Sequence, residues 1–178
     1  MSTAADDPTA LLRAALVAEL AKKTAVSWVR HAGRTYAVWH VWADDALCLV
    51  SGGDEQRLPE IPDGEHVEVV MRSKDTGGRL LTWVAHTSVV RPGDAAWEPT
   101  TSALVSARLN LDDPSSTAAR WAEHSVVRRL VPDGEFVESP GALTDDAHRA
   151  VPPQTPATTR GALPRVLHRR VERRPRLD

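Results

Sequence analysis

Five apolar segments between residues 25 and 90 are joined mainly by tight turns, and this spacing constrains the fold more than any other feature. The segments are 25–31, 35–42, 46–51, 66–72 and 79–90. Turn-forming pairs such as Ala32-Gly33, Asp44-Asp45 and Gly77-Gly78 separate several of them. Parallel strands need crossovers of about a dozen residues or more, so the segments predict an antiparallel sheet.

Several of these segments lack a clean alternation of apolar and polar residues. Residues 46–51, ALCLVS, are apolar almost throughout, which is typical of a strand covered on both faces. A sixth strand is predicted at 124–131, after two helical segments. We therefore predict a mainly β (α+β) fold in which six antiparallel strands form a closed or half-closed barrel with flanking helices.

The helices are predicted from their first turns and apolar spacing. Asp7-Pro8 resembles an N-cap with proline at the first helical position, and Lys22-Lys23 has the favourable sign for a helix C-terminus. Between them Leu12, Leu16 and Leu20 recur at helical spacing. Further helices are predicted at 97–111 and from Asp113 onward.

The chain of 178 residues is long enough for one domain with a substantial core. Seven of its thirteen prolines lie from residue 132 onward, where large apolar residues are few. We therefore place the domain at 1–135, with a disordered linker and tail at 136–178. Residues 160–178 contain seven Arg and two acidic residues. This Arg-rich segment is either a solvated tail or a contact for nucleic acid, an acidic protein or an anionic membrane.

The loop after the third predicted strand is a candidate site for an anionic ligand. Ser51 offers a hydroxyl, two glycines allow close backbone approach, and Arg57 can bind two phosphate oxygens. Arg72 and Lys74, at the end of the next strand, add positive charge. The alternative is an ordinary surface loop, because its two acidic residues, 54 and 55, oppose a phosphate.

An aromatic slot for a flat ring is a second candidate. Its members are Trp39, His40 and Trp42 on one predicted strand, with Trp83 and His86 on another. Strict alternation puts Trp39 on the opposite face from His40 and Trp42, so only part of the set can share a wall. Core packing is the alternative for each ring.

Other kinds of site find little support. The seven His residues form no metal-binding spacing, and no hydrolase or nucleotide-binding motif is present. We therefore predict no metal site. The single cysteine, Cys48, lies in an apolar strand, which favours an inert buried thiol. Without a secretion signal or an apolar run long enough to span a membrane, we expect a cytoplasmic protein.

The order of these elements resembles the FMN-binding split barrel of the pyridoxamine 5′-phosphate oxidase-like superfamily. The resemblance lies in AVWHVWADDALCLVS, followed by Gln56-Arg57-Leu58, and in VEVVMR, LLTWVAHTSVVRPGD and VVRRLVPDG. It covers about residues 8–135. It implies a six-stranded split barrel that forms a homodimer with two flavin sites at the subunit interface.

The resemblance also implies where the cofactor lies. It puts the FMN phosphate near Ser51, Gln56 and Arg57, with Arg72 and Lys74 nearby. Many members have a lysine in the loop after the third strand, and this loop has none. FMN, a deazaflavin and no flavin at all therefore stay open.

Two functions follow. The first is a flavin-binding barrel that acts as a flavin-dependent oxidoreductase on an unknown small molecule, with the flavin doing the redox work and no side chain singled out as catalytic. The second is a non-enzymatic binding or regulatory module whose Arg-rich tail contacts an anionic partner.

Overall fold

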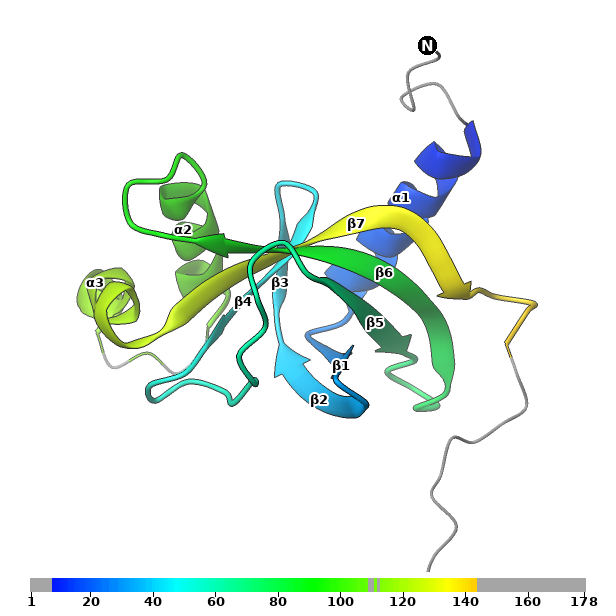
Figure 1. Ribbon diagram of the computed structural model, residues 1–178, viewed down its shortest axis with the longest axis horizontal. Coiled ribbons are helices and arrows are strands. Elements are labelled where there is room, and N and C mark those ends of the chain that lie inside the picture. The colour runs from blue at the N-terminus through cyan, green and yellow to red at the C-terminus, as the bar shows by residue number, and fades with distance from the viewer. Residues whose placement is uncertain (1–7, 109–110, 112, 144–178) are drawn as a thin grey trace, which may run out of the picture. The chain divides into compact units, whose positions relative to one another are not determined.

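Seven antiparallel strands form a single curled sheet in the computed structural model, which describes residues 8–108, 111 and 113–143 (Figure 1). The strands are β1 (Val26–His31), β2 (Arg34–Trp39), β3 (Val41–Ala43), β4 (Ala46–Ser51), β5 (His66–Arg72), β6 (Arg79–Val90) and β7 (Val126–Glu138). Three helices are α1 (Pro8–Lys23), α2 (Trp97–Ala107) and α3 (Pro114–His124). The mainly β, antiparallel fold predicted from the turns is confirmed.

The predicted number of six strands is wrong, because the segment 35–42 is two strands. It breaks at His40: β2 pairs only with β1, and β3 pairs only with β4. At the break the His40 backbone N–H bonds Ala25 O at 3.1 Å, and its ring is buried beside α1. The chain thus leaves one ladder and joins another without a turn, so seven strands form.

This break also explains how the sheet curls. The strand order is β2-β1-β5-β6-β7-β4-β3, so the two edge strands are also consecutive in the chain, with only His40 between them. A flat sheet of seven strands cannot be linked across its full width by one residue. The sheet therefore curls into a half-barrel whose edges meet at residues 39–41, a junction that we call the seam (Figure 1).

Two hydrophobic cores lie on the two faces of the sheet. One gathers Leu47, Leu49 and Leu130 with residues of β5 and β6, and α1 adds Val17 and Ala21. The other gathers Cys48 and Val50 of β4 with residues of α2 and α3, including Trp97 and Trp121. Strand β4 is buried along its whole length because it faces both cores, as its continuous apolar run predicts.

Helix α1 is confirmed, and its predicted apolar side is confirmed in part, because Leu16 and Leu20 pack against the core. Val17 and Ala21 are buried, whereas Leu12 is 71% exposed and its neighbour Leu11 63%. Where the helix meets β7, Arg13 donates to Gly134 O at 3.2 Å. Leu11 and Leu12 thus lie on the solvent side, and the apolar residues of the helix that pack against the core all lie in its second half.

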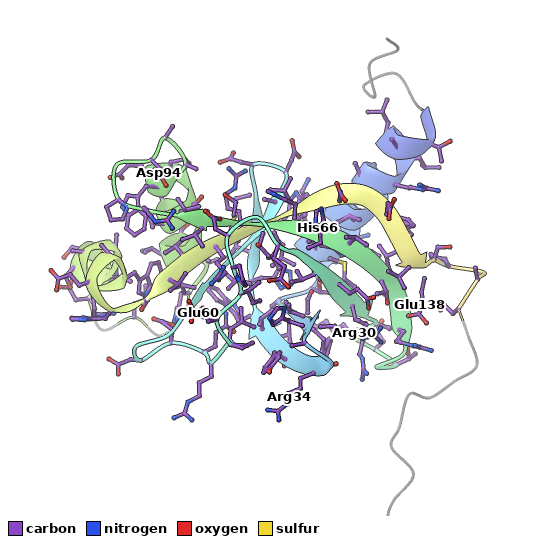
Figure 2. The ribbon with its side chains drawn as sticks, viewed as in Figure 1. Arg30, Arg34, Glu60, His66, Asp94 and Glu138 are labelled. Atoms are coloured by element: carbon purple, nitrogen blue, oxygen red, sulfur yellow. The ribbon has the colours of Figure 1, made fainter. Side chains whose placement is uncertain are left out.

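Strand β7 continues well past the end predicted at residue 131. Pro132 lies inside it, where the β6–β7 pairing shifts register. Such irregularities let a strand accept a residue that has no N–H to donate. The strand ends at buried Glu138, labelled in Figure 2, which accepts from Thr82 Oγ1 at 2.7 Å and pairs with Arg79 at 2.8 Å. From residue 144 on, the predicted tail lies outside the described residues.

Within the described part of the chain, no helix is long and apolar enough to cross a membrane.

Candidate functional site

A cleft of about 780 Å³ opens beside the seam of the half-barrel. Its walls come from the end of α1 and the residues that lead into β1, from residues 39–42, and from the end of β5 with the turn that follows. Clefts of roughly 300–1,000 Å³ are the usual size for cofactors and other small ligands. The cleft at the seam thus has the size of a ligand site, and its walls come from segments that lie far apart in the sequence.

Three tryptophans give the cleft an aromatic wall. Trp28 comes from β1, Trp39 ends β2, and Trp42 lies in β3. All three are half-buried, so part of each side chain stays accessible to a ligand. Flat aromatic ligands gain about 0.5–1.5 kcal/mol per well-placed ring beyond simple burial. The wall is thus suited to a planar aromatic group.

Four basic residues accompany these rings. Lys22 and Lys23 end α1, while Arg72 and Lys74 flank the end of β5. Lys23 is paired with Glu19 at 2.6 Å. Among the described residues that line the cleft there is no aspartate or glutamate. The cleft therefore favours a ligand that carries negative charge.

His40 is the most deeply buried polar side chain of the cleft wall. It is 3% exposed, and its Nε2 lies 3.3 Å from Ala21 O. A carbonyl oxygen can only accept, so Nε2 carries the hydrogen. Burial lowers the pKa of His40 to about 4 despite this bond and a second carbonyl, that of Val38. The ring is therefore neutral at pH 7 and adds no charge to the cleft.

The five residues predicted to hold a cofactor separate into two groups. Arg72 and Lys74 line the cleft. Ser51, Gln56 and Arg57 do not: Ser51 is buried opposite Val126 of β7, and Arg57 is exposed to solvent. The structure therefore brings Arg72 and Lys74 to the cleft and leaves the loop after β4 outside it.

The Gln56 side chain is fully engaged with the backbone. Its Oε1 accepts from Trp39 N at 2.6 Å, and its Nε2 donates to Trp39 O at 2.8 Å and to Val50 O at 3.0 Å. A glutamine amide has two hydrogens to donate. Both are used here, so Nε2 has none left for a ligand.

The rest of this loop packs against the helices. Glu55 accepts from Trp121 Nε1 at 2.8 Å and forms a close ion pair with Arg108. Gly53 has a φ of +60°, and a Cβ there would lie 2.8 Å from His124 O. The glycine thus serves close packing against the end of α3, a role that sequence alone cannot separate from backbone approach to a phosphate.

The predicted aromatic slot is also divided. Trp39, His40 and Trp42 line the cleft together, because the break at His40 interrupts the alternation that would separate them. Trp83 is 1% exposed within the core, and His86 instead contacts the ring of His66 at 5.6 Å between centroids.

Sequence reasoning missed Trp28, Lys22 and Lys23 as cleft residues. A signal existed: the two lysines end a helix three residues before the strand that carries Trp28. What the sequence does not show is that this connection lies beside the β5–β6 turn.

A reactive cysteine or a group of metal-binding side chains would be a second kind of site. Cys48 is buried, and that burial raises the pKa of its thiol, as expected for an inert cysteine. In the described residues no group of three or more His, Cys, Asp or Glu side chains could hold a metal ion.

The chain thus forms a half-barrel with an aromatic, positively charged cleft beside the seam. No protein-family profile matches the chain, and no curated protein matches it either. Two solved structures resemble it. The heme storage protein HutZ from Vibrio cholerae is 14% identical, with 68% of this chain and 91% of HutZ covered and a TM-score of 0.47.

The other is a pyridoxamine 5′-phosphate oxidase, so described provisionally, from Listeria innocua. It is 18% identical, with 70% of this chain and 97% of that chain covered and a TM-score of 0.38. Likenesses at this level concern the course of the chain and carry no information about its ligand.

Proposed function

We propose that the cleft at the seam binds a flavin, either FMN or a deazaflavin, and that the protein is a flavin-dependent oxidoreductase. The observation that carries the proposal is the pairing of three tryptophans with four basic residues in one cleft. A flavin nucleotide has the matching chemistry, a planar ring joined to an anionic chain.

The residues of the cleft fit such a ligand. Arg72 and Lys74 would hold the phosphate, Arg72 through its planar fork and Lys74 as a point charge. The tryptophans would flank the ring and exclude water from it. Because His40 is neutral, the positive charge of the cleft comes from its three lysines and Arg72. When bound, the flavin supplies the hydride-accepting ring, and the chain supplies orientation and a water-poor wall.

The test is a titration of the purified, flavin-free protein with FMN, followed by visible absorption and tryptophan fluorescence. Lys74→Ala combined with Arg72→Ala should weaken FMN binding about 10- to 100-fold, the scale of charged hydrogen bonds. Arg57→Ala is the matched control, because Arg57 is an exposed arginine outside the cleft. It should leave FMN binding unchanged.

Riboflavin makes the test sharper, since it has the same ring and no phosphate. The double variant should bind riboflavin as well as the wild type does. If instead Arg57→Ala weakens FMN binding and the double variant does not, the phosphate lies at the loop after β4. If neither FMN nor a deazaflavin binds the wild type, the proposal is wrong. Parallel titrations with the two flavins decide which is preferred.

A homodimer, which the resemblance implies, is part of the same proposal, and the molar mass in solution tests it. The Arg-rich segment 160–178 lies outside the described residues, so its contact with an anionic partner stays a prediction. Deleting residues 150–178 and measuring retention on nucleic acid or anionic vesicles tests that alternative.

A further inference from the structure

The last residue of β2, Trp39, has backbone groups that none of the seven described strands satisfies. The bond from His40 N to Ala25 O marks Val26 and Trp39 as a pair without mutual hydrogen bonds in the antiparallel ladder. The N–H and C=O of Trp39 therefore point away from β1. Because β2 is an edge strand, no further strand of the described residues lies on that side.

Gln56 takes the place of that missing strand. Its amide accepts from Trp39 N and donates to Trp39 O, the two bonds that a neighbouring strand would make. Its third bond, to Val50 O, reaches β4 on the other side of the seam. One side chain thus joins the two sides of the curled sheet.

The residue held in this way forms part of the cleft wall. Trp39 lines the cleft, while the guanidinium of Arg108 lies 5.8 Å from its ring centroid. Arg108 is in turn paired with Glu55, the neighbour of Gln56. Two successive loop residues therefore act on Trp39, one through its backbone and one through Arg108.

We propose that Gln56 is a positioning residue for the ligand cleft: it closes the seam and fixes Trp39 in the wall against which the ligand ring packs. The proposal rests on the proposed function for the identity of the ligand. It differs from the sequence prediction, in which Gln56 touches the cofactor directly.

Gln56→Ala and Gln56→Glu test the proposal. Gln56→Ala removes all three bonds and should weaken FMN affinity about tenfold, measured well below the unfolding temperature. In a Trp39→Ala background the same change should leave the FMN affinity nearly unchanged, because Gln56 acts through Trp39. Arg57→Ala, the adjacent change, is the control.

Gln56→Glu separates positioning from a merely structural role by its pH profile. As a carboxylate it has no hydrogen for Trp39 O or Val50 O, and as a carboxylic acid it can donate one. The ratio of its FMN dissociation constant to that of the wild type should therefore fall as the pH is lowered. A purely structural role would shift the melting temperature and leave this ratio flat.

Hydrogen exchange at the Trp39 amide tests the role of Gln56 without any ligand. The amide should be protected in the wild type and exchange fast in Gln56→Ala. If the wild type binds no FMN but this difference appears, the proposed function fails and the role of Gln56 at the seam stands. If exchange is unchanged, or Gln56→Ala binds FMN within twofold of the wild type, the positioning role is wrong.

Discussion

The guanidinium carbon of Arg72 lies 4.8 Å from the centroid of the Trp28 ring, at the rim of the cleft. A cation above an indole face is attracted by the negative potential of the ring, by about 0.5–1 kcal/mol at exposed sites. The pair thus joins the charged part of the cleft to its aromatic wall, and it leads to the first prediction.

Arg72→Lys should bind FMN more weakly than the wild type and more tightly than Arg72→Ala. Lysine keeps the charge, but it loses the planar fork that binds two phosphate oxygens and covers Trp28. Titration of the three proteins with FMN gives the order. Equal affinities of the Arg72→Lys and Arg72→Ala variants would mean that charge at this position does not act on the ligand.

Lowering the pH should destabilise the protein through His40. Its pKa in the folded state is about 4, below the unfolded value near 6.5, because burial disfavours the charged ring. The unfolded state therefore binds more protons between these values, and stability is lost as the pH falls from about 6.5 toward 4. The contribution is on the order of 3 kcal/mol.

Urea unfolding of the wild type and of His40→Gln, from pH 7.5 to 4, measures this contribution as the difference between the two pH dependences. Parallel profiles for the wild type and His40→Gln would contradict the prediction.

Removing the Glu55 carboxylate should destabilise the fold. Glu55→Ala leaves the indole N–H of Trp121 and the guanidinium of Arg108 without the carboxylate that both contact. Unpaired groups of this kind cost about 1–3 kcal/mol. The free energy of unfolding in urea measures the loss. Asp54→Ala, the exposed neighbour, should stay within about 0.5 kcal/mol of the wild type.

Gly53→Ala should cost more than Gly33→Ala. Both glycines have positive φ, +60° and +73°, so both alanines are strained. Only at Gly53 would the new Cβ meet another atom, His124 O at 2.8 Å, whereas nothing lies within 4 Å at Gly33. We expect about 1 kcal/mol for Gly33→Ala and at least about twice that for Gly53→Ala. Thermal unfolding measures the stability loss of each variant, and the difference between the two losses is the cost of the clash beyond the backbone strain.

The local sequence predicts where the strands of this fold lie, but it does not predict which strands pair. Turn residues and the apolar run of β4 predict antiparallel strands, since both signals act over a few residues. The break at His40 leaves no such trace, because it arises from a bond to Ala25 and a ring buried under α1. Likewise, the passage of β7 through Pro132 depends on a register shift in its partner strand.

The candidate site shows the same division. Arg72 and Lys74 could be predicted because charge at a strand end is visible in the sequence, and both line the cleft. Gln56 has the chemistry of a ligand donor, and only contacts with residues 6 and 17 positions away show that its hydrogens are used. Polarity predicts that a residue needs a partner. It does not say whether the partner is a ligand or the chain itself.

The seam at residues 39–41 has a further consequence for self-association. An exposed strand edge is a template to which other chains can add, and β2 and β3 are the two edges of this sheet. Because the curl turns the end of β2 toward the loop after β4, Gln56 occupies the backbone groups of Trp39 that an incoming strand would need. Opening the seam would therefore uncover an edge to which other chains can add. A chain whose seam has opened should then aggregate while it still retains its helices.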